Sequence, residues 1–174
     1  MAGAPLVGLV FDAWADLDRV AAGVPVQDLL LKPAGGSAIA WSVGHVTNQL
    51  DGWVNVRFAG LTAHDLIGSR EFRDGDGRAT DWEAIRAGVA QVRSRARAYL
   101  ERLSDHDLVP TIPYDGSIDE LREGGISLRY ALMRIAVHHY FHIGEIAAYL
   151  GSLGRDVGPF PSHLTEVLAS SSPS

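Results

Sequence analysis

Apolar residues recur at alternating intervals of three and four positions in four long stretches of the chain. This spacing puts them on one face of an α-helix, the pattern of a helix that buries that face against a core. The stretches cover residues 6–21, 43–59, 82–103 and 128–153. The third is the most regular, with apolar side chains at Trp82, Ile85, Val89, Val92, Ala96, Tyr99 and Leu103. The pattern predicts four amphipathic helices.

Residues with preferences for helix ends support these limits. Ser42 and Ser127 are suited to cap the second and fourth helices, because a serine hydroxyl accepts a hydrogen bond from a free backbone N–H. Thr80–Glu83 has the form of a capping box, which predicts the start of the third helix. Gly154 follows the fourth helix at the position where many helices end in a left-handed residue.

The connecting segments are rich in glycine, proline and polar residues. Residues 60–79 are interpreted as a solvated loop. No long helix is expected across 104–126, which contains two prolines, and Val109–Tyr114 is expected to be extended. A short helix is predicted at Ser162–Leu168, followed by a disordered tail over 170–174.

Four long helices without a convincing sheet predict an all-α protein built as a helical bundle. The chain has 174 residues, of which 47% are apolar, which is ordinary for a globular protein. A single domain over residues 1–169 is therefore expected, because this length suffices for one hydrophobic core.

Composition and charge exclude several classes of function. The chain has no cysteine, which rules out disulfides, cysteine nucleophiles and thiolate metal sites, and fits a reducing compartment. Its net charge of −6 disfavours binding to nucleic acids and to anionic membranes. The N-terminus lacks the basic region of a signal peptide, and no apolar run reaches the length of a membrane span. We therefore expect a cytoplasmic protein without nucleic-acid or membrane partners.

Three arginines lie on the outer face of the third predicted helix: Arg86, Arg93 and Arg97. A charged outer face is usually solvated, so we expect these three side chains to be exposed to water. Contact with an anion is the alternative.

Histidines are concentrated in the fourth predicted helix, where HHYFH holds His138, His139 and His142 between apolar residues. Burying several imidazoles in an apolar face costs free energy unless they have partners. Residues four apart on a helix lie about 6 Å from each other on one face, a separation at which two imidazoles can share a cation. His45, in the second helix, could supply a third nitrogen and leave metal positions open for water or substrate. The spacing alone does not decide between His138 and His139.

Two segments of the chain resemble the DinB-like superfamily, the damage-inducible four-helix proteins. These are WSVGHVTNQLDGW in the second helix and HHYFHIGEI in the fourth. The family pattern has a histidine in helix two and H-x-x-x-H-x-G-Q in the last long helix. His45 matches the first histidine, His138 and His142 match the pair, and Gly144 matches the glycine. Glu145 departs from the pattern, because glutamine is common there.

The resemblance implies a four-helix bundle of up-down-down-up or related topology. It also favours His138 over His139 as a metal ligand. The other histidines are then expected to have structural or surface roles: His64, His106, His139 and His163.

The resemblance further implies that His45, His138 and His142 hold a divalent metal ion, Zn or Ni, with Fe as an alternative. Several relatives are thiol-dependent S-transferases or isomerases that use low-molecular-weight thiols such as bacillithiol or mycothiol. A metal-bound thiol or water would be deprotonated and become the nucleophile. We therefore expect a metal-dependent enzyme with a small-molecule substrate, either a thiol S-transferase or isomerase or, where water is the nucleophile, a hydrolase. The alternatives are a non-catalytic metal-binding bundle that acts as a binding or stress-related module, and a bundle without metal.

Glu145 is the candidate catalytic carboxylate, because it lies one turn after His142 and near its face. The alternative is a surface or capping carboxylate.

A homodimer is also expected. The third helix carries a long apolar face, the chain has four tryptophans, and bundles of this family often pair through a helix face. The alternative is that the protomer's own core contains every tryptophan.

Overall fold

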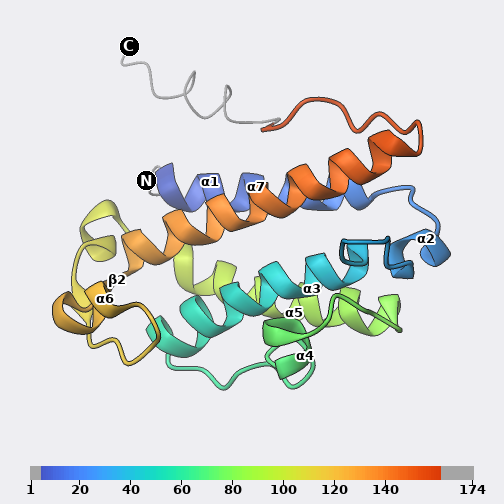
Figure 1. Cartoon of the computed structure of the whole chain (residues 1–174). Helices are drawn as coiled ribbons and strands as arrows, with labels where there is room; N and C mark the ends of the chain where they lie inside the picture. The colour runs from blue at the N-terminus through green and yellow to red at the C-terminus, as the bar shows by residue number, and fades with distance from the viewer. Residues whose placement is uncertain (1–4, 162–174) are drawn as a thin grey trace, which may run out of the picture.

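The computed structural model describes residues 5–161, and its long elements are helices (Figure 1). Residues 162–174 are outside the described range, so the helix expected at Ser162–Leu168 and the tail expected at 170–174 lie there too. The long helices are α1 (Pro5–Ala21), α3 (Ile39–Leu50), α5 (Trp82–Leu100) and α7 (Leu128–Ser152), and η1 (Asp51–Phe58) continues α3 as a π-helix. The predicted all-α class is confirmed.

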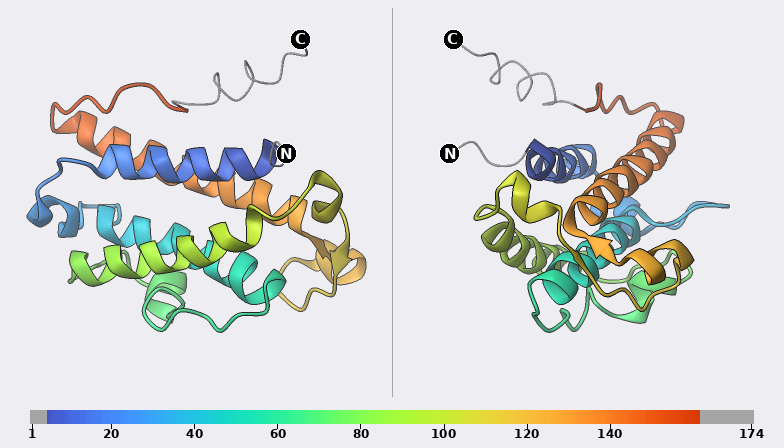
Figure 2. Two further views of the ribbon diagram at one scale, coloured as in Figure 1. Left: turned by 180° about the vertical axis from the view of Figure 1, so that it is seen from behind. Right: turned by 90° about the vertical axis from the view of Figure 1, so that its left-hand side faces the viewer.

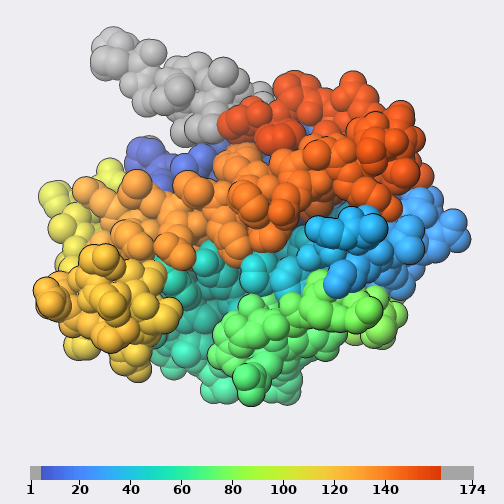
Figure 3. Space-filling view, in the orientation of Figure 1, coloured from blue at the N-terminus to red at the C-terminus, as the bar shows by residue number. Residues whose placement is uncertain are grey.

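The four long helices form two layers, with α1 beside α7 and α3 beside α5 (Figure 2). Helices α1 and α7 run in one direction, and α3 and α5 run in the other (Figure 1). This is the up-down-down-up order. Helix α3 also packs against α7, and this seam between the layers lies on the face shown in Figure 3. Segments far apart in the sequence, around residues 45 and 140, are thereby brought together.

Short elements occupy the connections. They are α2 (Val26–Leu30), α4 (Arg70–Asp74), a 3₁₀-helix η2 (Asp105–Leu108), α6 (Asp119–Gly124), and strands β1 (Thr111–Ile112) and β2 (Ile126–Ser127). The strands pair antiparallel, with Thr111 opposite Ser127. The extended segment expected at Val109–Tyr114 is thus present in part.

Residues 60–79, which the sequence predicts to be a solvated loop, also contain regular structure. Helix α4 lies within them, and its Phe72 is 1% exposed. The buried side chains of Ile67 and Phe72 dock this segment against the core.

One predicted helix start is wrong by a few residues, and one predicted cap is wrong by a single residue. Helix α3 begins at Ile39, and Ser42 is buried inside it, because residues 38–41 are all buried and extend the apolar face toward the N-terminus. Helix α5 is capped by Asp81, whose side chain accepts a hydrogen bond from the backbone N–H of Ala84 (3.0 Å). Thr80 stands one residue before the cap. Ser127 caps α7 as predicted, and Gly154 has the positive φ expected after it.

The inner faces of the helices form one apolar core. The apolar face of α5 packs into this core. Its buried residues are Ile85, Val89, Val92, Ala96 and Leu100. Trp14 and Trp41 are buried as well. Among the described residues, no helix is both long enough and apolar enough to cross a bilayer.

Candidate metal centre

Helices α3 and α7 bring His45, His138 and His142 to one point on their shared seam. One ring nitrogen of each residue lies within 4.8 Å of the corresponding nitrogens of the other two. The ring centroids of His138 and His142 are 4.7 Å apart, and those of His45 lie 4.9 and 5.1 Å from them. The sequence prediction that these three histidines converge is confirmed, and the structure selects His138 over His139 for the cluster.

The outer nitrogen of each ring faces an oxygen atom. Nδ1 of His45 is 2.5 Å from the carbonyl oxygen of Phe72, and Nδ1 of His138 is 2.9 Å from Oε1 of Gln49. Because carbonyl and amide oxygens only accept hydrogen bonds, both Nδ1 atoms carry the proton. Partners of this kind fix the tautomer and orientation of metal-binding histidines.

Glu145 faces the third ring in a related way. Its Oε2 lies 2.7 Å from Nδ1 of His142. The contact is within ion-pair distance but is not aligned as a hydrogen bond. A carboxylate at this position attracts a proton on Nδ1 of His142 and thereby favours the tautomer that leaves Nε2 free.

These contacts direct unprotonated nitrogens toward the centre of the cluster. Nε2 of His138 and Nε2 of His142 are 3.1 Å apart. Two lone pairs at this distance repel each other unless a proton or a cation lies between them. Two nitrogens bound to one ion at about 2.0–2.1 Å would stand about 2.9 Å apart at a right angle and about 3.3 Å apart at the tetrahedral angle. The observed separation therefore fits a shared metal ion.

Burial favours the neutral form of His138 and His142. It lowers the pKa of His138 to about 4, with the neighbouring His142 and His45 adding to the effect. Burial, followed by the proximity of His45, lowers the pKa of His142 to about 4. Neutral imidazole is the form that binds metal, so proton competition at the centre is weak at neutral pH.

Local packing helps to hold His45 in place. The indole of Trp41 stacks on its ring with centroids 4.5 Å apart, and Nε1 of Trp41 donates a hydrogen bond to the carbonyl of Glu71 (2.9 Å). Gly44 allows α4 to approach, because a Cβ there would lie 2.4 Å from the ring of Phe72. The glycine thus permits the contact between the Phe72 carbonyl and His45.

A cavity of about 450 Å³ lies between the 33–37 loop and α7, and none of the three histidines lines it. Glu145 contributes to its wall, together with Ser37, Ser42 and Tyr149. Glu145 is thus the residue that both contacts His142 and lines the cavity. Its pKa is raised by partial burial.

The remaining described histidines lie elsewhere. His139 is fully buried in the core, where its Nδ1 donates to the carbonyl of Ile135 (2.8 Å). Nδ1 of His64 accepts a hydrogen bond from the backbone N–H of Ile67 (3.2 Å), and His106 is exposed. His163 lies outside the described residues.

Sequence reasoning missed the groups that orient the imidazoles. Gln49 follows His45 by one helical turn, so its place on the same face was visible, but its partner on α7 was not. Trp41 has the same spacing on the other side of His45. The contact from Phe72 comes from its backbone, and no side-chain pattern indicates such a contact.

Comparison with known proteins identifies the family of the chain. A search of the curated proteins finds no match. The family model described as the DinB superfamily matches residues 12–146, which include all three histidines of the cluster and Gln49, Phe72 and Glu145. The chain belongs to the DinB superfamily.

Proposed function

We propose that this protein is a divalent-metal-dependent enzyme, a thiol-dependent S-transferase or isomerase. His45, His138 and His142 would hold the ion, with Zn or Ni favoured and Fe as the alternative, because imidazole suits all three. The observation that carries the proposal is the 3.1 Å separation of the Nε2 atoms of His138 and His142, whose outer nitrogens face oxygen atoms.

Three neutral ligands leave the charge of a divalent ion uncompensated, so a bound ion would lower the pKa of a thiol or water and supply a nucleophile at neutral pH. The protein needs no cysteine for this chemistry. Gln49 and the Phe72 carbonyl hold two of the rings in the orientation that binding requires.

Glu145 is proposed as the catalytic carboxylate. It contacts His142 and lines the cavity, and its side chain is 52% exposed. A carboxylate in this position can accept a proton from a group bound in the cavity, and it favours protonation of Nδ1 of His142. Its raised pKa brings it nearer to the pH at which a general base works best.

The cavity beside Glu145 is proposed as the site for the small-molecule substrate. Its volume of about 450 Å³ lies within the usual range for small-ligand sites. A low-molecular-weight thiol is the substrate proposed, in a reducing cytoplasmic compartment.

A homodimer is proposed as the assembled form. The apolar face of α5, which suggested pairing, is buried within the protomer and is no longer available. The surface that supports pairing now is the outer face of α7, where Met133, Val137 and Phe141 recur every four residues and are 54–70% exposed. Light scattering tests this: a Val137→Glu variant should have half the mass of the parent, and a parent mass near 18.7 kDa would contradict it.

The enzymatic proposal is tested by measuring thiol consumption. Metal-free protein, and protein reloaded with Zn²⁺ or Ni²⁺, is incubated with bacillithiol, mycothiol or cysteine and a chromogenic electrophile. Turnover should require the metal, and Glu145→Gln should slow it and change its pH profile while metal content stays constant. Stoichiometric metal without turnover of any thiol would instead favour a non-catalytic metal-binding bundle.

A further inference from the structure

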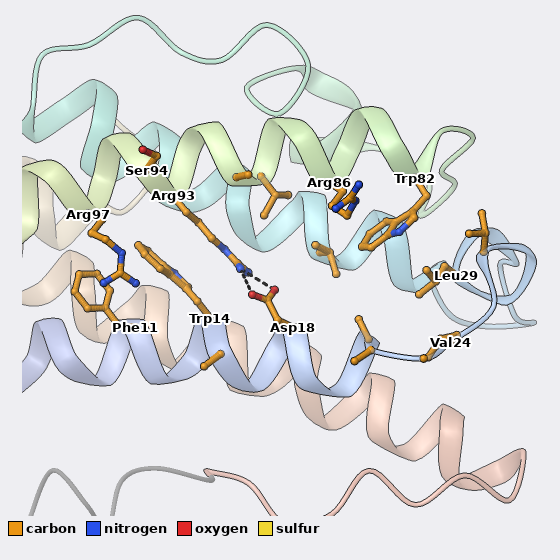
Figure 4. A pocket seen from close by; sticks show the side chains of 18 residues that line it. Phe11, Trp14, Asp18, Val24, Leu29, Trp82, Arg86, Arg93, Ser94 and Arg97 are labelled. Atoms are coloured by element: carbon orange, nitrogen blue, oxygen red, sulfur yellow. Dashed lines mark hydrogen bonds and ion pairs between the residues drawn. The ribbon is translucent and has the colours of Figure 1, made fainter.

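A groove of about 850 Å³ runs between α1 and α5 (Figure 4). These two helices face the viewer when the molecule is turned by 180° from the view that shows the α3–α7 seam (Figure 2). Within the described range, α1 and α5 are not among the pairs of helices that pack closely, whereas α1–α7, α3–α5 and α3–α7 are. Side chains that project from the two helices therefore line an open space. Its volume is within the range of small-ligand sites.

The groove combines aromatic walls with arginines. Phe11 and Trp14 from α1 and Trp82 from α5 supply aromatic surface. Arg86, Arg93 and Arg97 line the same space from α5 (Figure 4). Spacings of seven and four residues place all three on one helical face. Arg93, with a side chain only 12% exposed, is not the solvated surface residue that the sequence analysis took it to be.

Arg93 has donors that the described protein leaves unused. Its Nη1 donates to both carboxylate oxygens of Asp18, at 2.7 and 2.8 Å across the groove. Its Nε and Nη2 are buried and have no hydrogen-bond partner among the described residues, and the same holds for Nε1 of Trp14. Buried donors without partners are costly and rare in folded proteins, so an acceptor is expected here.

The acidic partners of these arginines are easily exchanged. Asp18 is 64% exposed. Arg86 pairs with Glu83, and Arg97 pairs with Glu101; both acids are exposed, and neither lines the groove. The two exposed pairs, Arg86–Glu83 and Arg97–Glu101, contribute little free energy, because water solvates both charges, and water also solvates the Asp18 carboxylate when it leaves Arg93. A ligand carboxylate that is partly shielded by the aromatic walls can therefore replace Asp18 at Arg93.

Aromatic contacts hold the guanidinium groups over the groove. The guanidinium carbon of Arg97 lies 4.0 Å from the ring centroid of Phe11, and that of Arg93 lies 5.6 Å from Trp14. Such stacking fixes the planar fork that binds carboxylates through two parallel hydrogen bonds.

We propose that this groove is a second ligand site, which binds a small carboxylate with an aromatic or similarly flat apolar body. The carboxylate takes the place of Asp18 on Arg93, and the body lies against the aromatic walls. The site is separate from the histidine cluster and does not depend on the enzymatic proposal.

The test uses the indole N–H signals of the tryptophans in a ¹⁵N-correlation spectrum. Trp14 and Trp82 line the groove, whereas Trp41 and Trp53 do not. The probe is naphthalene-1-carboxylate, with neutral naphthalene-1-methanol as its counterpart. Metal-free His142→Ala protein is used, so that the probe cannot bind at the metal centre. The carboxylate should shift the Trp14 and Trp82 signals in a saturable way, and the alcohol should not. Equal shifts with both probes, or shifts confined to Trp41 and Trp53, would overturn the proposal.

Substitutions give effects of opposite sign. Arg93→Gln should weaken binding of the carboxylate by about tenfold or more, because it removes a charge-assisted pair. Asp18→Asn should tighten binding, because it removes the competing carboxylate. Arg97→Gln, at an exposed position where folding is not at risk, should weaken binding, whereas Arg95→Gln, on the same helix but outside the groove, should leave it unchanged. An unchanged affinity in folded Arg93→Gln and Arg97→Gln, or weaker binding in Asp18→Asn, would contradict the assignment.

Discussion

At the scale of single residues, the behaviour of the histidine cluster depends on groups that would not themselves bind metal. Gln49 is the clearest case, because its Oε1 fixes the proton of His138 on Nδ1. Gln49→Leu should therefore weaken metal binding by about 10–100-fold while the fold is kept. Calorimetric titration with Zn²⁺ measures this, and Gln91→Leu, at an exposed position of α5, is the matched control. Equal affinities in both variants would show that Gln49 does not orient the ring.

His139 leads to a prediction about pH. Burial lowers its pKa to about 3, and its Nε2 has no partner among the described residues. The unfolded chain takes up a proton near pH 6.5, and the folded protein does not until about pH 3. Stability therefore falls as the pH falls below about 6.5, and His139 accounts for about 2 kcal/mol of the loss between pH 7 and pH 5.

His139→Leu removes this contribution. The variant should therefore lose about 2 kcal/mol less stability than the parent between pH 7 and pH 5. Urea unfolding of both proteins at pH 7 and pH 5 gives the comparison. Parallel losses in the two proteins would mean that His139 is not held neutral in the folded state.

At the scale of elements, the contact between α4 and α3 links folding to the histidine cluster. Gly44→Ala places a methyl group against Phe72, which should destabilise the protein by about 1–3 kcal/mol and displace the carbonyl that orients His45. Metal affinity should fall as well. Gly52→Ala meets open space and should be neutral or stabilising by up to about 1 kcal/mol. Denaturant unfolding and metal titration of both variants check this, and a Gly44→Ala protein as stable as the parent would contradict it.

The long helices were predictable from sequence because their periodicity extends over several turns, but the short elements were not. Helix α4 depends on contacts with α3 that link residues far apart in the chain, such as Phe72 against Gly44 and the Glu71 carbonyl with Trp41. The π-helix η1 is set by packing too. It buries Asp51 and Asn55, and these bond to each other, to the backbone N–H of His64 and to the carbonyl of Val92.

The same limit applies to the two sites. The spacing of the histidines indicated a shared face with His45 as a possible third ligand, but only the family resemblance favoured His138 over His139. The three arginines of α5 were visible as one face of a helix. Periodicity does not show whether neighbouring helices separate, so the groove beside α1 was not predictable.

At the scale of the whole molecule, a bound metal would join α3 to α7 and so stabilise the folded state. Added Zn²⁺ or Ni²⁺ should raise the melting temperature, since binding at 100 times Kd contributes about 2.7 kcal/mol. His138→Ala or His142→Ala should abolish the rise, and His106→Ala, at an exposed position, should not. Equal rises in all of these proteins would indicate nonspecific binding.

The most direct test of the central claim is the metal content of protein purified without added metal, measured by elemental mass spectrometry. We predict about one divalent ion per chain in the parent and in His106→Ala. We predict no stoichiometric metal in folded His45→Ala, His138→Ala or His142→Ala, because each removes one of the three converging nitrogens. A parent protein that neither contains nor takes up a divalent ion, or variants that retain the parent's metal content, would contradict the assignment of a three-histidine metal centre.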